Sequence, residues 1–275
     1  MTAPQATHSY FRRSRLLPHV EMRQATQSPA CYQTHSHDEF SVGVIDAGIA
    51  RYRNRQHINT IHQGMTVMIN PGEAHSCNPD PGQRWSYRML FIDAQWLGQL
   101  QRATPHLRGG DYTPFACISN TAPACARQFD DLFKTLAQEI NPLAADEKLI
   151  CFLMAHGFHR PLGTRERAPA ERPLERAREL ILDQLAENIT LTSMAEVAGL
   201  SPYHLIRRFK QAYGQTPHAF QLDQRINRGK QLLKQGQAIV DVALQLGFAD
   251  QSHFQRHFKS RHALTPLVYQ NPTGI

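Results

Sequence analysis

The sequence contains few cysteines and no long apolar run, and each shortage excludes a class of protein. The cysteines number five, an odd count, and no two of them form a C-x-x-C pair. This argues against a zinc ribbon and against a full disulfide framework. No stretch approaches the roughly 20 apolar residues that span a bilayer, and the N-terminus lacks the apolar run of a secretory signal. We therefore expect a reduced, cytoplasmic protein with no membrane partner.

The sequence also has fewer acidic than basic side chains. The chain of 275 residues has 30 Lys and Arg against 23 Asp and Glu, a formal charge of +7. A basic balance favours anionic partners, nucleic acid before membrane surfaces. Hydrophobic residues make up 41% and charged residues 19%, which is typical of a folded protein long enough for two domains.

The first half of the chain is expected to be mainly β structure. Residues 1–30 are polar without a clear period, which indicates a loosely attached N-terminal tail or, through Arg12, Arg13 and Arg15, a DNA-binding arm. Segments 40–45, 50–53, 66–69 and 85–92 are rich in β-branched or aromatic residues and are separated by Gly and Pro-Gly breaks. This pattern predicts a β-barrel or sandwich.

Helical periodicity follows. Asp93 is a candidate N-cap for a helix reaching Leu100, and apolar stripes predict helices over about 121–140 and 146–159. The last two form a helical hairpin that either makes a dimer surface or packs on its own barrel. The Pro-, Gly- and charge-rich segment 161–172 is the expected linker. We therefore predict a tail (1–30), an effector-binding and dimerisation domain (31–160), this linker, and an all-α domain (173–275).

The C-terminal part contains an internal repeat, with copies at 194–217 and 242–266. The matched pairs are Ala195 with Ala243, Gly199 with Gly247, Leu205 with Phe254, Phe209 with Phe258, and Thr216-Pro217 with Thr265-Pro266. Each copy predicts a short helix ended by glycine, a tight turn, and a second helix capped by Ser201 or Asp250. This is the pattern of a helix-turn-helix unit.

The predicted outward faces of the two second helices lack acidic residues. Arg, Gln, Ser and His side chains can read base edges, and Lys and Arg also hold phosphate. The candidate DNA-binding residues are Tyr203, His204, Arg207, Arg208, Lys210, Gln251, Ser252, His253, Gln255, Arg256 and Lys259. A helix over 217–234 would space the two units by about 27 Å, near the about 34 Å repeat of the major groove.

Residues 173–270 resemble the DNA-binding domain of the AraC/XylS family of bacterial transcription regulators. The segment from Gly247-Phe248 to Phe258-Lys259, ending in Thr265-Pro266, carries the resemblance. It implies that Tyr203, His204 and Arg207 face DNA in the first unit, and that the second unit uses Gln251, Ser252, His253, Gln255 and Arg256. One departure is Gly229, where the family usually carries alanine, so we expect a less rigid helix there.

A second motif, His35-Ser-His37-Asp-Glu39 with His75 after Pro71-Gly72, lies in the β region. On a strand, residues two apart share a face. Together these segments resemble the cupin barrel that serves as sensor in many AraC-type regulators, which implies that His35, His37, Glu39 and His75 line an effector site. The acid of the metal-binding cupin pattern is missing, because Ser41 and Val42 stand in its place. We therefore expect no metal or other cofactor.

The sequence thus predicts a multi-domain α+β regulator that binds double-stranded promoter DNA and a small-molecule effector as a homodimer, with no catalytic residues. Two alternatives remain open: a metal sensor using the histidines, and a metal-dependent cupin enzyme fused to a DNA-binding module.

Overall fold

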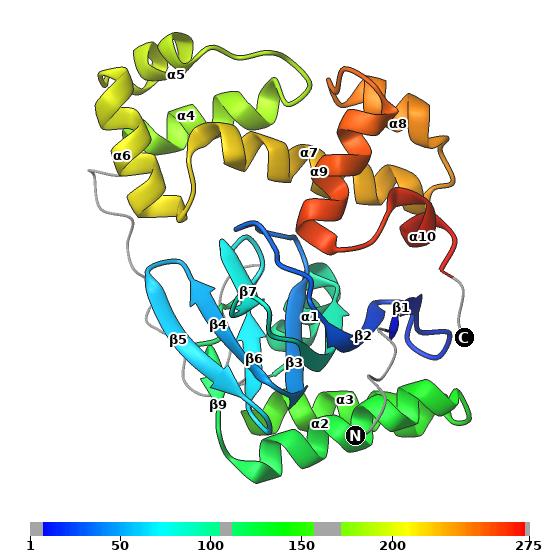
Figure 1. Cartoon of the computed structure of the whole chain (residues 1–275). Coiled ribbons are helices and arrows are strands. Elements are labelled where there is room, and N and C mark those ends of the chain that lie inside the picture. The colour runs from blue at the N-terminus through cyan, green and yellow to red at the C-terminus, as the bar shows by residue number, and fades with distance from the viewer. Residues whose placement is uncertain (1–7, 105–111, 157–171, 273–275) are drawn as a thin grey trace.

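The computed structural model describes residues 8–104, 112–156 and 172–272. Its β-rich N-terminal domain lies against an all-helical C-terminal domain (Figure 1). The predicted linker at 161–172 falls, apart from Arg172, outside the described residues. Of the helices described, none has both the length and the apolar character needed to cross a membrane.

The N-terminal domain is built on two antiparallel sheets. One has six strands in the order β1-β2-β8-β3-β6-β9, and the other has three in the order β5-β4-β7. Within the described residues these sheets stay open and face each other, so the expected barrel is a cupin-like sandwich. The bounds are β1 His8–Arg13, β2 Val20–Ser28, β3 Phe40–Ala47, β4 Ile49–Asn54, β5 His57–His62, β6 Thr66–Ile69, β7 His75–Pro79, β8 Trp85–Ile92 and β9 Ser119–Asn120.

The four predicted strand segments are confirmed as β3, β4, β6 and β8. The prediction of a loose tail over residues 1–30 is wrong for 8–28, because β1 and β2 pair with each other and β2 pairs with β8. Strand β2 alternates apolar and polar residues but is buried on both faces: Val20 and Met22 on one, Glu21 and Arg23 on the other. Its polar face packs against the C-terminal domain.

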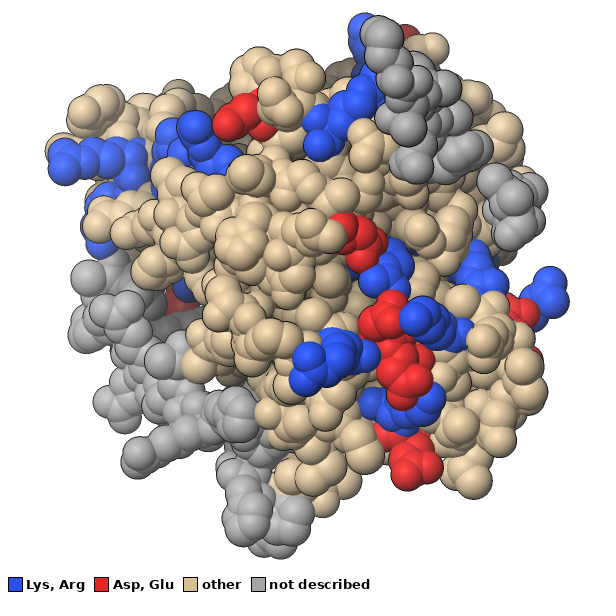
Figure 2. All heavy atoms as spheres, turned by 60° about the horizontal axis from the view of Figure 1, so that its bottom comes forward, with Lys and Arg blue, Asp and Glu red and all other residues tan. Residues whose placement is uncertain are grey.

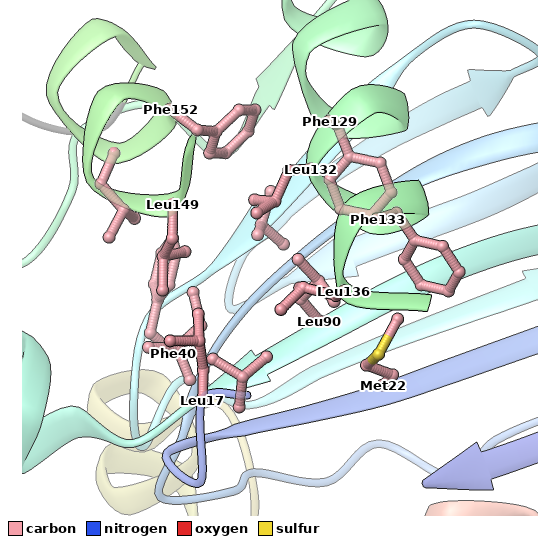
Figure 3. Packing of buried hydrophobic residues seen from close by; sticks show 14 of the residues in the cluster. Leu17, Met22, Phe40, Leu90, Phe129, Leu132, Phe133, Leu136, Leu149 and Phe152 are labelled. Atoms are coloured by element: carbon pink, nitrogen blue, oxygen red, sulfur yellow. The ribbon is translucent and has the colours of Figure 1, made fainter. Parts of the chain in front are cut away.

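Three helices complete this domain: α1 Ala94–Ala103, α2 Pro123–Gln138 and α3 Pro142–His156. As predicted, the Asp93 carboxylate caps α1 by accepting from the Trp96 N–H at 2.8 Å. The hairpin of α2 and α3 buries its apolar stripes on the six-stranded sheet (Figure 3). The core formed there includes Phe129, Leu132, Phe133, Leu136, Leu149 and Phe152 of the hairpin together with Met22, Phe40 and Leu90 of the strands.

The C-terminal domain consists of two helix-turn-helix units joined by one long helix (Figure 1). Its helices are α4 Arg172–Asp183, α5 Leu191–Ala198, α6 Pro202–Tyr213, α7 Pro217–Lys234, α8 Ile239–Gln245, α9 Gln251–His262 and α10 Pro266–Gln270. Units α5–α6 and α8–α9 confirm the sequence repeat. Gly199 ends α5 with a φ of 62°, and the Asp250 carboxylate accepts from the His253 N–H at 2.6 Å.

Gly229 has a packing role in α7. A Cβ placed there would lie 3.0 Å from two ring carbons of Phe254 and 3.2 Å from Leu246. The missing methyl group therefore lets α9, the second helix of the second unit, approach α7 closely. The glycine costs about 1 kcal/mol of helix propensity, but it makes room for a fully buried phenylalanine.

Candidate nucleic-acid interface and ligand cavity

Helices α6 and α9 present most of the predicted DNA-binding residues to solvent. On α6, Tyr203 is 70% exposed, and His204, Arg207 and Lys210 are exposed beside it while Arg208 is half-buried. On α9, the exposed residues are Gln251, Ser252, Arg256 and Lys259. Leu205 and Phe209, like Phe254 and Phe258, point into the domain core. The outward faces are thus polar or basic and free of acid.

His253 differs from its neighbours on α9. Its Nδ1 accepts from the Ala249 N–H at 3.4 Å, its Nε2 lies 3.0 Å from Nε2 of His257, and its ring packs against Phe248. Both ring nitrogens are therefore engaged within the protein. Gln255 is half-buried as well. The exposed part of this surface centres on Gln251, Ser252 and Arg256.

A cavity of about 70 Å³ lies inside the N-terminal domain, between the two sheets. Side chains of β2, β3, β6, β7 and β8 and of the segment before β3 form most of its wall. Arg261 and His262, at the end of α9, complete it from the other domain. One side of the cavity therefore belongs to α9.

His35, His37 and His75 come together in this cavity, as the sequence predicted. The ring of His75 lies 4.5 Å from that of His35 and 4.8 Å from that of His37. Residues 35–39 are not a regular strand, but His35 pairs with His75 through an isolated β-bridge. Each Nδ1 donates to a backbone carbonyl, those of Gln33, Glu39 and Glu73 respectively.

Burial lowers the pKa of the three imidazoles, to about 3 for His37, to about 4 for His75, and well below the usual value for His35. They are neutral at physiological pH. Because each Nδ1 carries the proton it donates, each Nε2 keeps a lone pair and acts as an acceptor. The cavity thus has a cluster of three neutral hydrogen-bond acceptors.

Glu39 does not join this cluster. Its Oε1 accepts from Nζ of Lys230 on α7 at 2.6 Å, and both side chains are largely buried. The glutamate is part of the domain interface and not of the cavity wall. No group of three or more His, Cys, Asp or Glu side chains in the described part of the chain is arranged to hold a metal ion.

Further polar contacts join the two domains. Asp223 on α7 binds Arg261 at 2.5 Å and accepts from the backbone N–H of Ser36 at 2.8 Å. Nζ of Lys234 lies 2.6 Å from Glu21, which also accepts from the hydroxyl of Tyr269 at 3.1 Å. The C-terminal domain is therefore docked over the open end of the cavity through α7, α9 and α10.

Sequence reasoning missed several cavity residues. Arg23 donates to the backbone carbonyl of His262, and its guanidinium lies 5.5 Å and 5.9 Å from the rings of Tyr32 and Tyr87. Trp85 also lines the cavity. No local sequence pattern identifies these residues as neighbours, because they come from separate segments and meet only in the folded sandwich.

Known proteins share both halves of this architecture. Residues 194–271 match the model of a helix-turn-helix domain, and residues 18–153 match that of the AraC-like ligand-binding domain. The regulator YbfI of Bacillus subtilis, described as an uncharacterized HTH-type transcriptional regulator, is 27% identical over 226 residues, 81% of each chain. The HTH-type transcriptional activator RhaS of Citrobacter koseri is 25% identical over 241 residues, 86% of this chain and 87% of its own.

Among solved structures, unsaturated-fatty-acid-bound ToxT of Vibrio cholerae aligns with a TM-score of 0.53 at 15% identity, over 100% of this chain and 99% of its own. This likeness shows the two-domain fold. Together with the matched domain models, it assigns the fold of each half. The chain belongs to the AraC family of transcription regulators, with an N-terminal ligand-binding domain and a C-terminal helix-turn-helix DNA-binding domain.

Proposed function

We propose that the protein binds promoter DNA sequence-specifically, with α6 and α9 in successive major grooves, and that a small molecule in the cavity controls this binding. The observation that carries the proposal is the pair of exposed, acid-free recognition helices on a single connecting helix. Helix α7 has 18 residues, about 27 Å of rise, which suits grooves about 34 Å apart.

The DNA-binding proposal is tested with genomic fragments captured by the full-length protein and sequenced. We expect discrete sites with two elements about one helical turn apart. Arg207→Ala and Arg256→Ala should each cost about 1–3 kcal/mol on such a site if the arginine reads a base. Arg53→Ala, at an exposed position on β4, is the matched control and should leave the affinity unchanged.

The remaining candidate residues have different roles in this proposal. Lys210 and Lys259 are exposed beside the reading faces and would hold phosphate, so their loss should weaken binding to all sequences alike. Tyr203, His204, Gln251 and Ser252 would contact base edges. Equal loss on every sequence after Arg256→Ala would count against base reading by that residue.

Control by a ligand follows from the position of the cavity. Its wall includes Arg261 and His262 of α9, so an occupant contacts both domains at once. A ligand that favours the docked arrangement changes the population of protein able to place both recognition helices on DNA. The bound fatty acid of ToxT is a precedent for a ligand on this fold, and the effector here need not be the same.

We further propose that the protein acts as a homodimer through the outer face of the α2–α3 hairpin. Three apolar side chains are exposed there: Ile140 by 79%, Leu143 by 76% and Met154 by 52%. Leu143 and Met154 are eleven residues apart, close to three full turns, and so share a face of α3. Figure 2 shows this side of the molecule, with charged groups gathered in part of the view and uncharged surface over much of the rest.

Sedimentation experiments, which measure the oligomeric state, test the dimer proposal. Leu143→Glu with Met154→Glu should convert a dimer into a monomer. Ile58→Glu on β5, where the apolar side chain is exposed by 52% as in Met154, should not. A wild-type protein that is monomeric at micromolar concentration would refute the dimer. In this proposal the protein is a binding protein without catalysis of its own, and it works in the cytoplasm with the chromosome.

A further inference from the structure

The cavity contains a buried positive charge that no acidic group balances. Arg23 is 7% exposed, and among the described residues no carboxylate lies within ion-pair distance of it. Its Nε has no hydrogen-bond partner within the described part of the chain. A buried cation without a counter-charge is costly, which suggests that an anionic group binds here.

Tyr32, Tyr87 and the carbonyl of His262 contact this guanidinium, but none of them carries a negative charge. Arg261, the other guanidinium of the cavity, is already paired with Asp223 at 2.5 Å. Burial raises the pKa of Tyr87 well above its usual value, so its phenol stays neutral beside Arg23. No Asp or Glu of the described residues lines the cavity. The wall therefore carries a net charge of one positive unit from Arg23.

The histidine cluster adds a different requirement. His35, His37 and His75 offer lone pairs at Nε2, because each Nδ1 donates to a backbone carbonyl. Nε2 of His37 lies 3.5 Å from the hydroxyl of Ser41, so a ligand that was only a carboxylate would leave the acceptors of His35 and His75 unmatched. An ammonium group would introduce a second buried cation, so a neutral hydroxyl is the better donor.

The cluster and the cation border one small space. The ring of Tyr32 lies between them, 5.5 Å from the guanidinium carbon of Arg23 and 6.2 Å from the ring of His35. The cavity volume is about 70 Å³. An apolar protein cavity of about 150 Å³ accommodates benzene, so this one fits a ligand with a short carbon chain.

We propose that the effector is a short-chain hydroxycarboxylic acid, with its carboxylate on Arg23 and its hydroxyl donating to Nε2 of the histidine cluster. The carboxylate meets the one unbalanced charge of the cavity, and the hydroxyl meets its unmatched acceptors. This inference rests on the proposed function, because it identifies the ligand of the controlling cavity.

Calorimetric titration of the full-length protein tests both contacts separately. The probes are lactate and 3-hydroxybutanoate, the acids lacking the hydroxyl (propanoate and butanoate), and the amides lactamide and 3-hydroxybutanamide. Each hydroxy acid should bind about tenfold or more tightly than its deoxy acid and than its amide, as expected for loss of one hydrogen bond to a buried group or of one charged contact.

Variants test which residue makes the contact with the carboxylate and which makes the contact with the hydroxyl. Arg23→Gln should abolish the preference for acid over amide, and Arg23→Lys should restore part of it by restoring the charge. His75→Phe, which leaves only His35 as an open acceptor, should reduce the preference for hydroxy over deoxy acid. The exposed Arg53→Gln is the control and should bind as the wild type does. Thermal unfolding of each variant establishes that it is folded.

The outcomes decide the proposal. Equal affinity for acid and amide overturns the role of Arg23, and equal affinity for hydroxy and deoxy acids overturns the role of the histidines. Absence of binding by both hydroxy acids at millimolar concentration overturns the ligand class. Capture of genomic DNA by the same preparation separates these results from failure of the regulator proposal, which would instead show as diffuse, salt-sensitive binding without discrete sites.

Discussion

The pair Lys230–Glu39 is expected to make a large contribution to domain docking. Nζ and Oε1 are 2.6 Å apart, and the side chains are only 7% and 14% exposed. Burial by itself would raise the pKa of Glu39, but Lys230 holds it at about 2. Breaking a buried pair from one side typically costs about 3–5 kcal/mol.

Lys230→Met should therefore weaken docking by about 3 kcal/mol, because it leaves the Glu39 carboxylate buried without its cation. Separation of the domains lets that carboxylate regain water, so the loss is limited by the free energy of docking. The double variant Glu39→Gln with Lys230→Met removes both charges and should recover much of the loss.

Urea denaturation measures the loss, and small-angle X-ray scattering detects separation as a larger radius of gyration. The matched control is Arg51→Met, which breaks a pair with Asp80 whose side chains are 70% and 65% exposed and should cost under about 1 kcal/mol. Costs below about 1 kcal/mol for Lys230→Met and for Glu39→Gln alone, with no coupling in the double variant, would refute the reasoning.

Three other predictions concern stability. The pKa values of His37 and His75 are held at about 3 and about 4, below the unfolded value, so the unfolded chain binds protons first. Folding stability should therefore fall as the pH drops below about 6.5, by about 2 kcal/mol per histidine at pH 5. Denaturation midpoints measured above pH 6.5 and at pH 5 test this, and a flat profile would contradict it. Gly229→Ala should cost about 1 kcal/mol in urea, because overpacking against Phe254 exceeds the helix-propensity gain; a stabilised variant would show that the ring moves aside. Asp250→Ala should cost about 1 kcal/mol through loss of the α9 cap, whereas an unchanged melting temperature would mean that the cap is replaced.

The helix-turn-helix units were predictable because their signals are local. A capping residue, a helix-ending glycine and an apolar pair four residues apart determine each unit within about 25 residues, and the two copies support each other. Helix propensity alone did not explain Gly229. Its reason is a tertiary contact with Phe254, which is distant in sequence.

The ligand cavity was only partly predictable. The three histidines were found by their spacing, but Arg23, Tyr32 and Trp85 have no local pattern that marks them as neighbours. The error at β2 has the same origin. Glu21 and Arg23 occupy the alternate positions that usually face solvent in a two-sided strand, yet here a second domain covers that face.

In the proposed function, helix α9 connects DNA binding with ligand binding. Its N-terminal residues Gln251 and Ser252 are exposed, and its last residues, Arg261 and His262, form part of the cavity wall. Twelve residues span about 18 Å, and the fully buried Phe254 and Phe258 fix the helix to its domain. A ligand that alters the contact between Arg23 and the carbonyl of His262 acts on the same helix that we propose to read DNA. Coupling between binding sites is reciprocal. If such a ligand changes the affinity for DNA, DNA bound at one end of α9 therefore changes ligand affinity at the other by the same factor.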